Sequence, residues 1–249
     1  MPTETITPTF VAVAVFVLVH LFVGRLQFLE GVPRSRWLSL AGGVAVAYVF
    51  LHILPELSSH QLTLENHTAT GRIAFLEAEI YLVTLAGLSS FYGLERCVRG
   101  SRAEVRACGQ ADEPERGVFR LHIGSFAIYN ALIGYLLVHR EQPGVWSLVF
   151  YTVAMALHFV TNDYGLRHDY KQAYDREARW IIAAAVVVGW LLGLFVEVSE
   201  IGLALLFAFL ARGVILNVLK EELPEERKSR FLPFLSGVVS YAALLMVAA

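Results

Sequence analysis

The sequence predicts an all-α membrane protein that crosses the bilayer several times. Of its 249 residues, 56% are hydrophobic and only 17% are charged, and the mean hydropathy is +0.57. Such a chain is too apolar for one soluble domain. Apolar runs of about 20 residues, enough to cross a hydrocarbon core of roughly 30 Å, recur along its length. The net charge of −2, with Arg residues in short clusters between these runs, argues against nucleic-acid binding.

Eight apolar runs are candidates for membrane-spanning helices. The expected spans are residues 8–28, 37–57, 74–94, 119–138, 145–166, 179–197, 200–219 and 231–248. The first run lacks a preceding basic stretch and a small-residue cleavage site, so we expect it to stay as a helix. The connectors are short except for 95–118, which is typical of a solvated loop. We therefore predict a single membrane domain over residues 1–249.

The distribution of Lys and Arg predicts the orientation of these spans. Of the 20 basic residues, 17 lie in connectors after odd-numbered spans or in the adjoining span ends, and two lie in connectors after even-numbered spans. Cytoplasmic loops carry the excess of basic residues, which predicts that loop 95–118 is cytoplasmic and that both termini are outside. The chain is thus expected to be a multi-pass protein of the cell membrane, in contact with the lipid bilayer. Its oligomeric state, including a homodimer, stays open.

Polar residues interrupt the second span at its expected outer end. His52 and Glu56 are four residues apart and so share one helical face, and Pro55 between them can loosen the helix. They could form the entrance of a pathway. An interfacial His and Glu in contact with water would give the same pattern.

A second group of polar residues lies in the fourth and fifth spans. Asn130 is deep in the fourth span between Gly124 and Gly134, small residues that we expect to face the fifth span. His158, Asn162 and Asp163 follow one another on the fifth. A His nitrogen, an amide oxygen and a carboxylate make a plausible mixed site for a divalent transition metal. The alternatives are an Asn that joins two helices, a His bonded to a carbonyl, and an Asp solvated at the membrane surface.

Arg212 lies deep inside the seventh expected span. A charge at such depth is costly unless it is paired or reaches water. Arg212 could pair with Asp163, or with Glu77 or Glu79, and it would then act as a charge that plugs the metal position. It could also extend along the helix to the inner membrane surface.

The order and character of these spans resemble the ZIP family of metal transporters. The stretch "GGVAVAYVFLHILPEL", residues 42–57, resembles that family's second span, which ends in H-x-x-P-E. The stretch "FLARGVILNVLKEELPE", residues 209–225, resembles its seventh span. The resemblance covers nearly the whole chain. It implies a ZIP-like bundle of eight helices, both termini outside, and a variable cytoplasmic loop between the third and fourth spans.

The family's metal motifs are only partly present. Residues 129–134 stand where ZIP proteins have H-N-x-x-D-G, and residues 158–163 stand where they have H-E-x-P-H-E. Asn130 and His158 are unchanged, Asp163 replaces a Glu, and Asn162 replaces a His. The resemblance therefore implies at most one metal position in place of the family's two.

Three classes of function follow from these observations. The first is a carrier that moves zinc or a similar divalent cation into the cytoplasm by rocking one helix bundle against another. The second is a protein of the same fold that does not carry metal and serves as a sensor, a partner subunit or a carrier of another solute. The third, an intramembrane zinc hydrolase, lacks a clear set of three His ligands. We expect a transporter and not an enzyme.

Overall fold

The computed structural model describes residues 3–26, 35–68, 79–107, 115–140, 144–222 and 230–248, and every regular element within these ranges is a helix. Five helical segments in the described part are long and apolar enough to cross a membrane: Ile6–Arg25, Arg36–Leu62, Arg116–Val138, Val145–Tyr170 and Tyr174–Phe195. The chain is therefore an all-α protein with helices suited to a membrane. The count of eight spans and the position of the termini stay predictions.

The helices in chain order are α1 (Thr3–Phe22), α2 (Arg36–Tyr48), α3 (Leu54–Thr68), α4 (Glu79–Ala107), α5 (Arg116–Val138), α6 (Val145–Tyr170), α7 (Arg179–Phe195), α8 (Glu200–Glu222) and α9 (Phe231–Ala248). A 3-10 turn, η1 (Val23–Arg25), ends the first segment. Two π-helical segments, η3 (Val49–Ile53) and η5 (Tyr174–Ala178), join α2 to α3 and lead into α7. Each expected span overlaps one of these helical segments.

The predicted loop 95–118 is wrong over its first half, because α4 continues to Ala107. The stretch from Glu95 to Ala107 is rich in Arg, Glu and Ala, which are good helix formers. Glu95 and Arg99 also lie 3.5 Å apart as an i,i+4 ion pair, an arrangement that supports an exposed helix. A hydropathy pattern identifies a helix only as far as its apolar residues extend. This helix continues through the charged residues that follow them.

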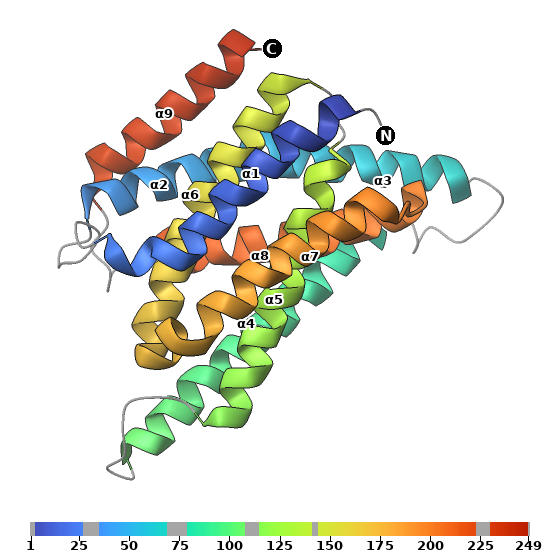
Figure 1. Cartoon of the computed structure of the whole chain (residues 1–249). Helices are drawn as coiled ribbons and strands as arrows, with labels where there is room; N and C mark the ends of the chain where they lie inside the picture. Colours follow the sequence, from blue (N-terminus) through green and yellow to red (C-terminus); the bar gives the residue numbers. More distant parts are fainter. Residues whose placement is uncertain are drawn as a thin grey trace.

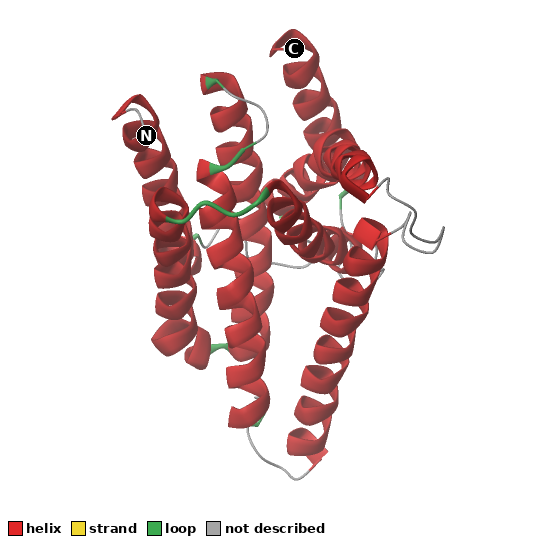
Figure 2. Cartoon of the chain, turned by 90° about the vertical axis from the view of Figure 1, so that its right-hand side faces the viewer, coloured by secondary structure: helices red, strands yellow, loops and turns green. Residues whose placement is uncertain are grey.

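By their contacts the helices fall into two groups, and Figure 1 shows where each helix lies. In the first bundle α5 packs most extensively on α7, and α1 packs on α6 and α7. In the second bundle α2 packs on α9, α4 packs on α8, and α3 contacts α4 and α8. The two bundles meet where α6 touches α2 and where α5 touches α4 and α8. Figure 2 shows that several helices run side by side while one helical segment crosses them and is seen nearly end-on.

Close backbone contact holds α5 against α7. A Cβ atom on Gly189 would lie 1.8 Å from the carbonyl oxygen of Ala131, and one on Gly134 would lie 2.2 Å from that of Val186. Small residues permit such approach between membrane helices. The expectation that Gly134 and Gly124 face the fifth span is therefore wrong, because Gly134 faces α7 and a Cβ on Gly124 would meet nothing within 4 Å.

Candidate functional site

Two small cavities lie where the two bundles meet. The first, here named the His158 cavity, has a volume of about 20 Å³, which is room for one ion or water molecule. Residues of α5 and α6 from the first bundle and of α4 and α8 from the second bundle line it. They are Phe91, Glu95, Phe126, Tyr129, His158, Asn162, Gly213 and Leu216.

His158 and Asn162 enter this cavity from one face of α6, because they are one helical turn apart. His158 is only 1% exposed, and its Nε2 is hydrogen-bonded to the Tyr129 hydroxyl at 2.9 Å. Nδ1 of His158 and Nδ2 of Asn162 are buried without a hydrogen-bond partner. Buried polar atoms normally have partners, so these two suggest a ligand in the cavity.

Glu95 adds a carboxylate from α4 that the sequence analysis did not select. Its side chain is largely buried, and Oε2 lies 3.7 Å from Nε2 of the buried His122. Glu95 falls just after the expected end of the third span, where a solvated role is the ordinary expectation. Glu95 reaches the cavity because α4 continues beyond the expected end of the third span.

The His158 cavity therefore combines an imidazole, an amide and a carboxylate. Such a mixed set of nitrogen and oxygen donors suits a divalent transition-metal ion held weakly. Among the described residues, no three His, Cys, Asp or Glu side chains group together as a metal site. A cation here would depend on His158 and Glu95 together with the amide oxygen of Asn162.

Asn130 and Asp163 are buried but do not line the His158 cavity. Asn130 donates from Nδ2 to the Phe126 carbonyl of its own helix at 2.8 Å. Asp163 faces α1, where its Oδ2 lies 2.6 Å from Nδ1 of His20 and both side chains are fully buried. The structure thus brings together only two of the four predicted metal ligands. A His inside the first apolar run was the signal that could have identified His20.

Arg212 lies beside the cavity and not across it. It is buried, donates from Nη1 to the Gly87 carbonyl at 3.1 Å, and places its guanidinium 3.1 Å from the ring centroid of Phe209. It therefore does not pair with Asp163, and it is not exposed at the protein surface. Glu77 and the side chain of Glu79 lie outside the described residues. The guanidinium also stacks over Phe91, which lines the His158 cavity, so its charge acts close to that cavity.

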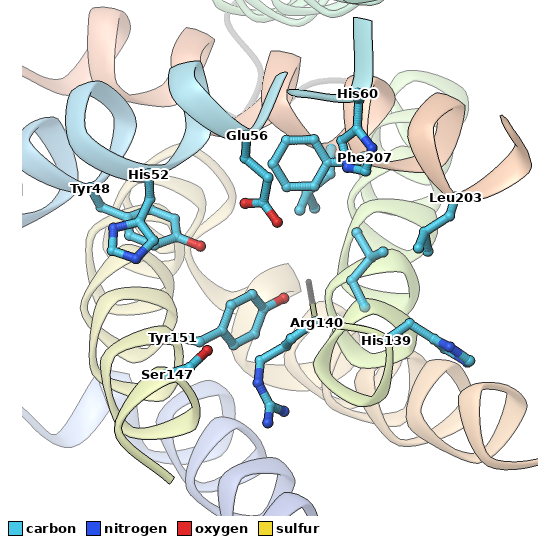
Figure 3. Close-up of a pocket in the computed structure, with 12 residues that line it drawn as sticks. Tyr48, His52, Glu56, His60, His139, Arg140, Ser147, Tyr151, Leu203 and Phe207 are labelled. Atoms are coloured by element: carbon cyan, nitrogen blue, oxygen red, sulfur yellow. The ribbon is translucent and has the colours of Figure 1, made fainter. Parts of the chain in front are cut away.

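The second cavity, here named the Glu56 cavity, has a volume of about 40 Å³ (Figure 3). Its lining residues are Tyr48, His52, Glu56, His60, Leu136, His139, Arg140, Ser147, Tyr151, Leu203, Phe207 and Leu210. The structure thus brings the predicted entrance residues His52 and Glu56 to one cavity. Figure 3 shows the Glu56 carboxylate pointing toward the Tyr151 side chain across the central space.

A π-helical segment presents His52 to the Glu56 cavity. His52 lies within η3, and its ring stacks on Tyr48 with 5.3 Å between centroids. Insertions of this kind in a helix occur frequently at functional sites. Arg140, just beyond the end of α5, contributes a cation on the opposite side, and burial lowers the pKa of its guanidinium.

Buried tyrosines line both cavities. Tyr129 lines the His158 cavity, whereas Tyr48 and Tyr151 line the Glu56 cavity, and Tyr129 lies within electrostatic range of both. Tyr151 donates its hydroxyl to the Ile133 carbonyl at 3.1 Å. Tyr129 of one cavity is thus close to the tyrosines of the other, and both cavities lie at the interface between the bundles.

Comparison with protein families, with curated protein sequences and with solved structures found no match to this chain. The resemblance to ZIP transporters thus stays an expectation from the motifs. Function is argued below from the chain's own residues.

Proposed function

We propose that the chain is a membrane carrier that moves a divalent transition-metal cation, such as zinc, through the interface between its two bundles. The observation that carries this proposal is the His158 cavity, to which both bundles contribute polar side chains. Polar residues within a membrane protein are costly and usually functional. Substrate sites of many carriers lie between two groups of helices that move against each other.

His158, Asn162 and Glu95 are the proposed cation ligands. Nε2 of His158 is hydrogen-bonded to the Tyr129 hydroxyl, and when Nε2–H donates to the Tyr129 oxygen, Nδ1 keeps its lone pair for a cation. A partner on one ring nitrogen orients the imidazole, as partners of metal-binding His residues do in other proteins. One imidazole, one amide and one carboxylate form a weak site, which suits a carrier that must release its cargo.

The Glu56 cavity serves as the entrance in this proposal. Its carboxylate and imidazoles offer ligands to a cation, the Arg140 guanidinium offsets the charge of the carboxylate, and the cavity lies at the same interface as the His158 cavity. A rocking motion of the bundles would open their interface first on one side and then on the other.

The second candidate is a membrane protein of this fold that binds no metal. The buried guanidinium of Arg212 favours it, because a fixed positive charge beside the His158 cavity opposes a divalent cation. Under this alternative the protein carries another solute, or it acts as a sensor or as a partner subunit.

Zinc titration of the purified protein, followed by calorimetry, tests the choice. The proposal predicts one zinc ion per chain and a loss of affinity of more than about tenfold in His158→Ala. His168→Ala is the matched control, since His168 lies on the same helix but is exposed. Binding that survives in His158→Ala, or no binding by the wild type, would favour the second candidate.

A further inference from the structure

A groove lies apart from both cavities, between the first turns of α2 and α9. Its volume is about 850 Å³. The two helices lie side by side in Figure 1, and α9 begins next to the first half of α2. The lining residues are Arg36, Trp37, Leu40, Arg230, Phe231, Leu232, Pro233 and Ser236.

The backbones around the groove are held together tightly. A Cβ on Gly43 would lie 2.1 Å from the carbonyl oxygen of Phe234, and one on Gly237 would lie 2.2 Å from that of Leu40. Ser39 accepts a hydrogen bond from the backbone N–H of Arg230 at 3.1 Å. These contacts fix the angle at which the helices cross, so the groove is a built feature.

Two kinds of side chain meet in this groove. Arg36 and Arg230 supply two positive charges, and none of the described residues that line the groove is acidic. Both helices begin here, so the positive ends of two helix dipoles add to that charge. The apolar wall is unusually open, because Trp37 is 62% exposed, Phe231 is 70% exposed and Leu232 is 75% exposed.

We infer that this groove binds an anionic phospholipid. The phosphate would lie between Arg36 and Arg230, and an acyl chain would lie along the apolar wall. A basic pocket between membrane helices is suited to anionic headgroups, and aromatic residues favour the level of those headgroups. Large apolar side chains of α9, including Val239 and Leu244, continue the exposed apolar surface toward the bilayer core. A water-soluble partner would leave this surface uncovered.

Native mass spectrometry in mixed phosphatidylglycerol and phosphatidylcholine tests the inference without reference to metal. Wild type is expected to retain phosphatidylglycerol in preference to phosphatidylcholine. The double variant Arg36→Gln/Arg230→Gln should lose that preference, by about fivefold for each arginine and roughly 30-fold together.

Arg96→Gln is the control for the change of charge, because Arg96 is exposed on α4 and lines neither the groove nor a cavity. It should bind lipid as the wild type does. A single size-exclusion peak at the wild-type position establishes that the double variant is folded. Equal retention of both lipids by the wild type, or undiminished phosphatidylglycerol binding by the folded double variant, would overturn the inference.

Discussion

At the scale of single residues, the state of His158 depends on Tyr129. The hydroxyl of Tyr129 holds one ring nitrogen of His158, and the aromatic ring of Tyr129 packs against Gly213, where a Cβ would lie 2.3 Å from it. A side chain at residue 213 would thus displace the ring that positions the imidazole. The hydroxyl of Tyr129 therefore orients His158, whereas its ring packs against Gly213. A substitution that removes only the hydroxyl distinguishes the two roles.

Tyr129→Phe keeps the ring and removes the hydroxyl. Because the imidazole of His158 loses the partner that orients it, zinc affinity should fall by about tenfold to a hundredfold. The fold should persist, since the aromatic packing is unchanged. Calorimetric titration of the folded variant measures this, and an unchanged affinity would show that Tyr129 does not position a metal ligand.

The pair formed by His20 and Asp163 should be a major contribution to stability. His20→Ala leaves the Asp163 carboxylate buried without its partner, which costs about 3–5 kcal/mol in comparable pairs. The midpoint of thermal unfolding in detergent should fall clearly. Combining His20→Ala with Asp163→Asn should restore part of the loss, because the unpaired charge is gone. If the two losses simply add, the residues are not coupled in the protein.

The limits of prediction at this scale concern partners far apart in sequence. The spacing of His158 and Asn162 placed both on one helical face, and both line the cavity. No local sequence pattern indicates that Asp163 contacts His20, which lies 143 positions earlier. None indicates that Arg212 donates a hydrogen bond to the carbonyl of Gly87. Such contacts follow from how the helices assemble.

At the scale of helices, hydropathy located the helical segments better than it located their ends or neighbours. The apolar windows all fall on helices, but α4 extends beyond its window on charged helix formers. Neighbours depend on which small residues face one another. The sequence indicated Gly134 as a contact residue, yet its partner is α7, because Gly189 supplies the matching small surface.

Gly189→Ala should separate α5 from α7. The new methyl group would lie 1.8 Å from the Ala131 oxygen, which is backbone and cannot rotate away. The expected result is a large drop in thermal stability or failure to accumulate in the membrane.

Gly124→Ala on α5 is the matched control for that change. Its methyl group meets nothing within 4 Å, so it should leave stability unchanged or raise it by about 0.5–1 kcal/mol through better helix propensity. Equal behaviour of the two variants, measured by the unfolding midpoint, would contradict the packing of α5 on α7.

At the scale of the whole molecule, two bundles enclose a polar interface within an apolar exterior. The five segments that meet the requirements for a span include α1, α5, α6 and α7 of the first bundle and the α2–α3 segment of the second. The apolar part of α9 described, Phe231–Met246, is shorter. Composition predicts a membrane protein directly, whereas the number of crossings and their direction also depend on connectors and on the bilayer.

Cysteine labelling tests the predicted orientation. Cys97 is a free, exposed thiol on α4, in the segment expected to be cytoplasmic. Cys108, the other cysteine, lies outside the described residues. An impermeant maleimide should fail to modify Cys97 in intact cells and should modify it once the membrane is opened. Ready labelling of intact cells would reverse the orientation.

Metal flux into liposomes that contain the purified protein tests the central claim most directly. With zinc, iron, manganese or cobalt outside and a metal-sensitive dye inside, the wild type should give weak but measurable flux above empty liposomes. His158→Ala should abolish this flux and His168→Ala should preserve it, while Arg212→Ala should leave it in place because Arg212 contributes no ligand. No flux by the wild type for any of the four metals, together with flux gained in Arg212→Ala, would contradict the claim and identify Arg212 as a charge that blocks the site.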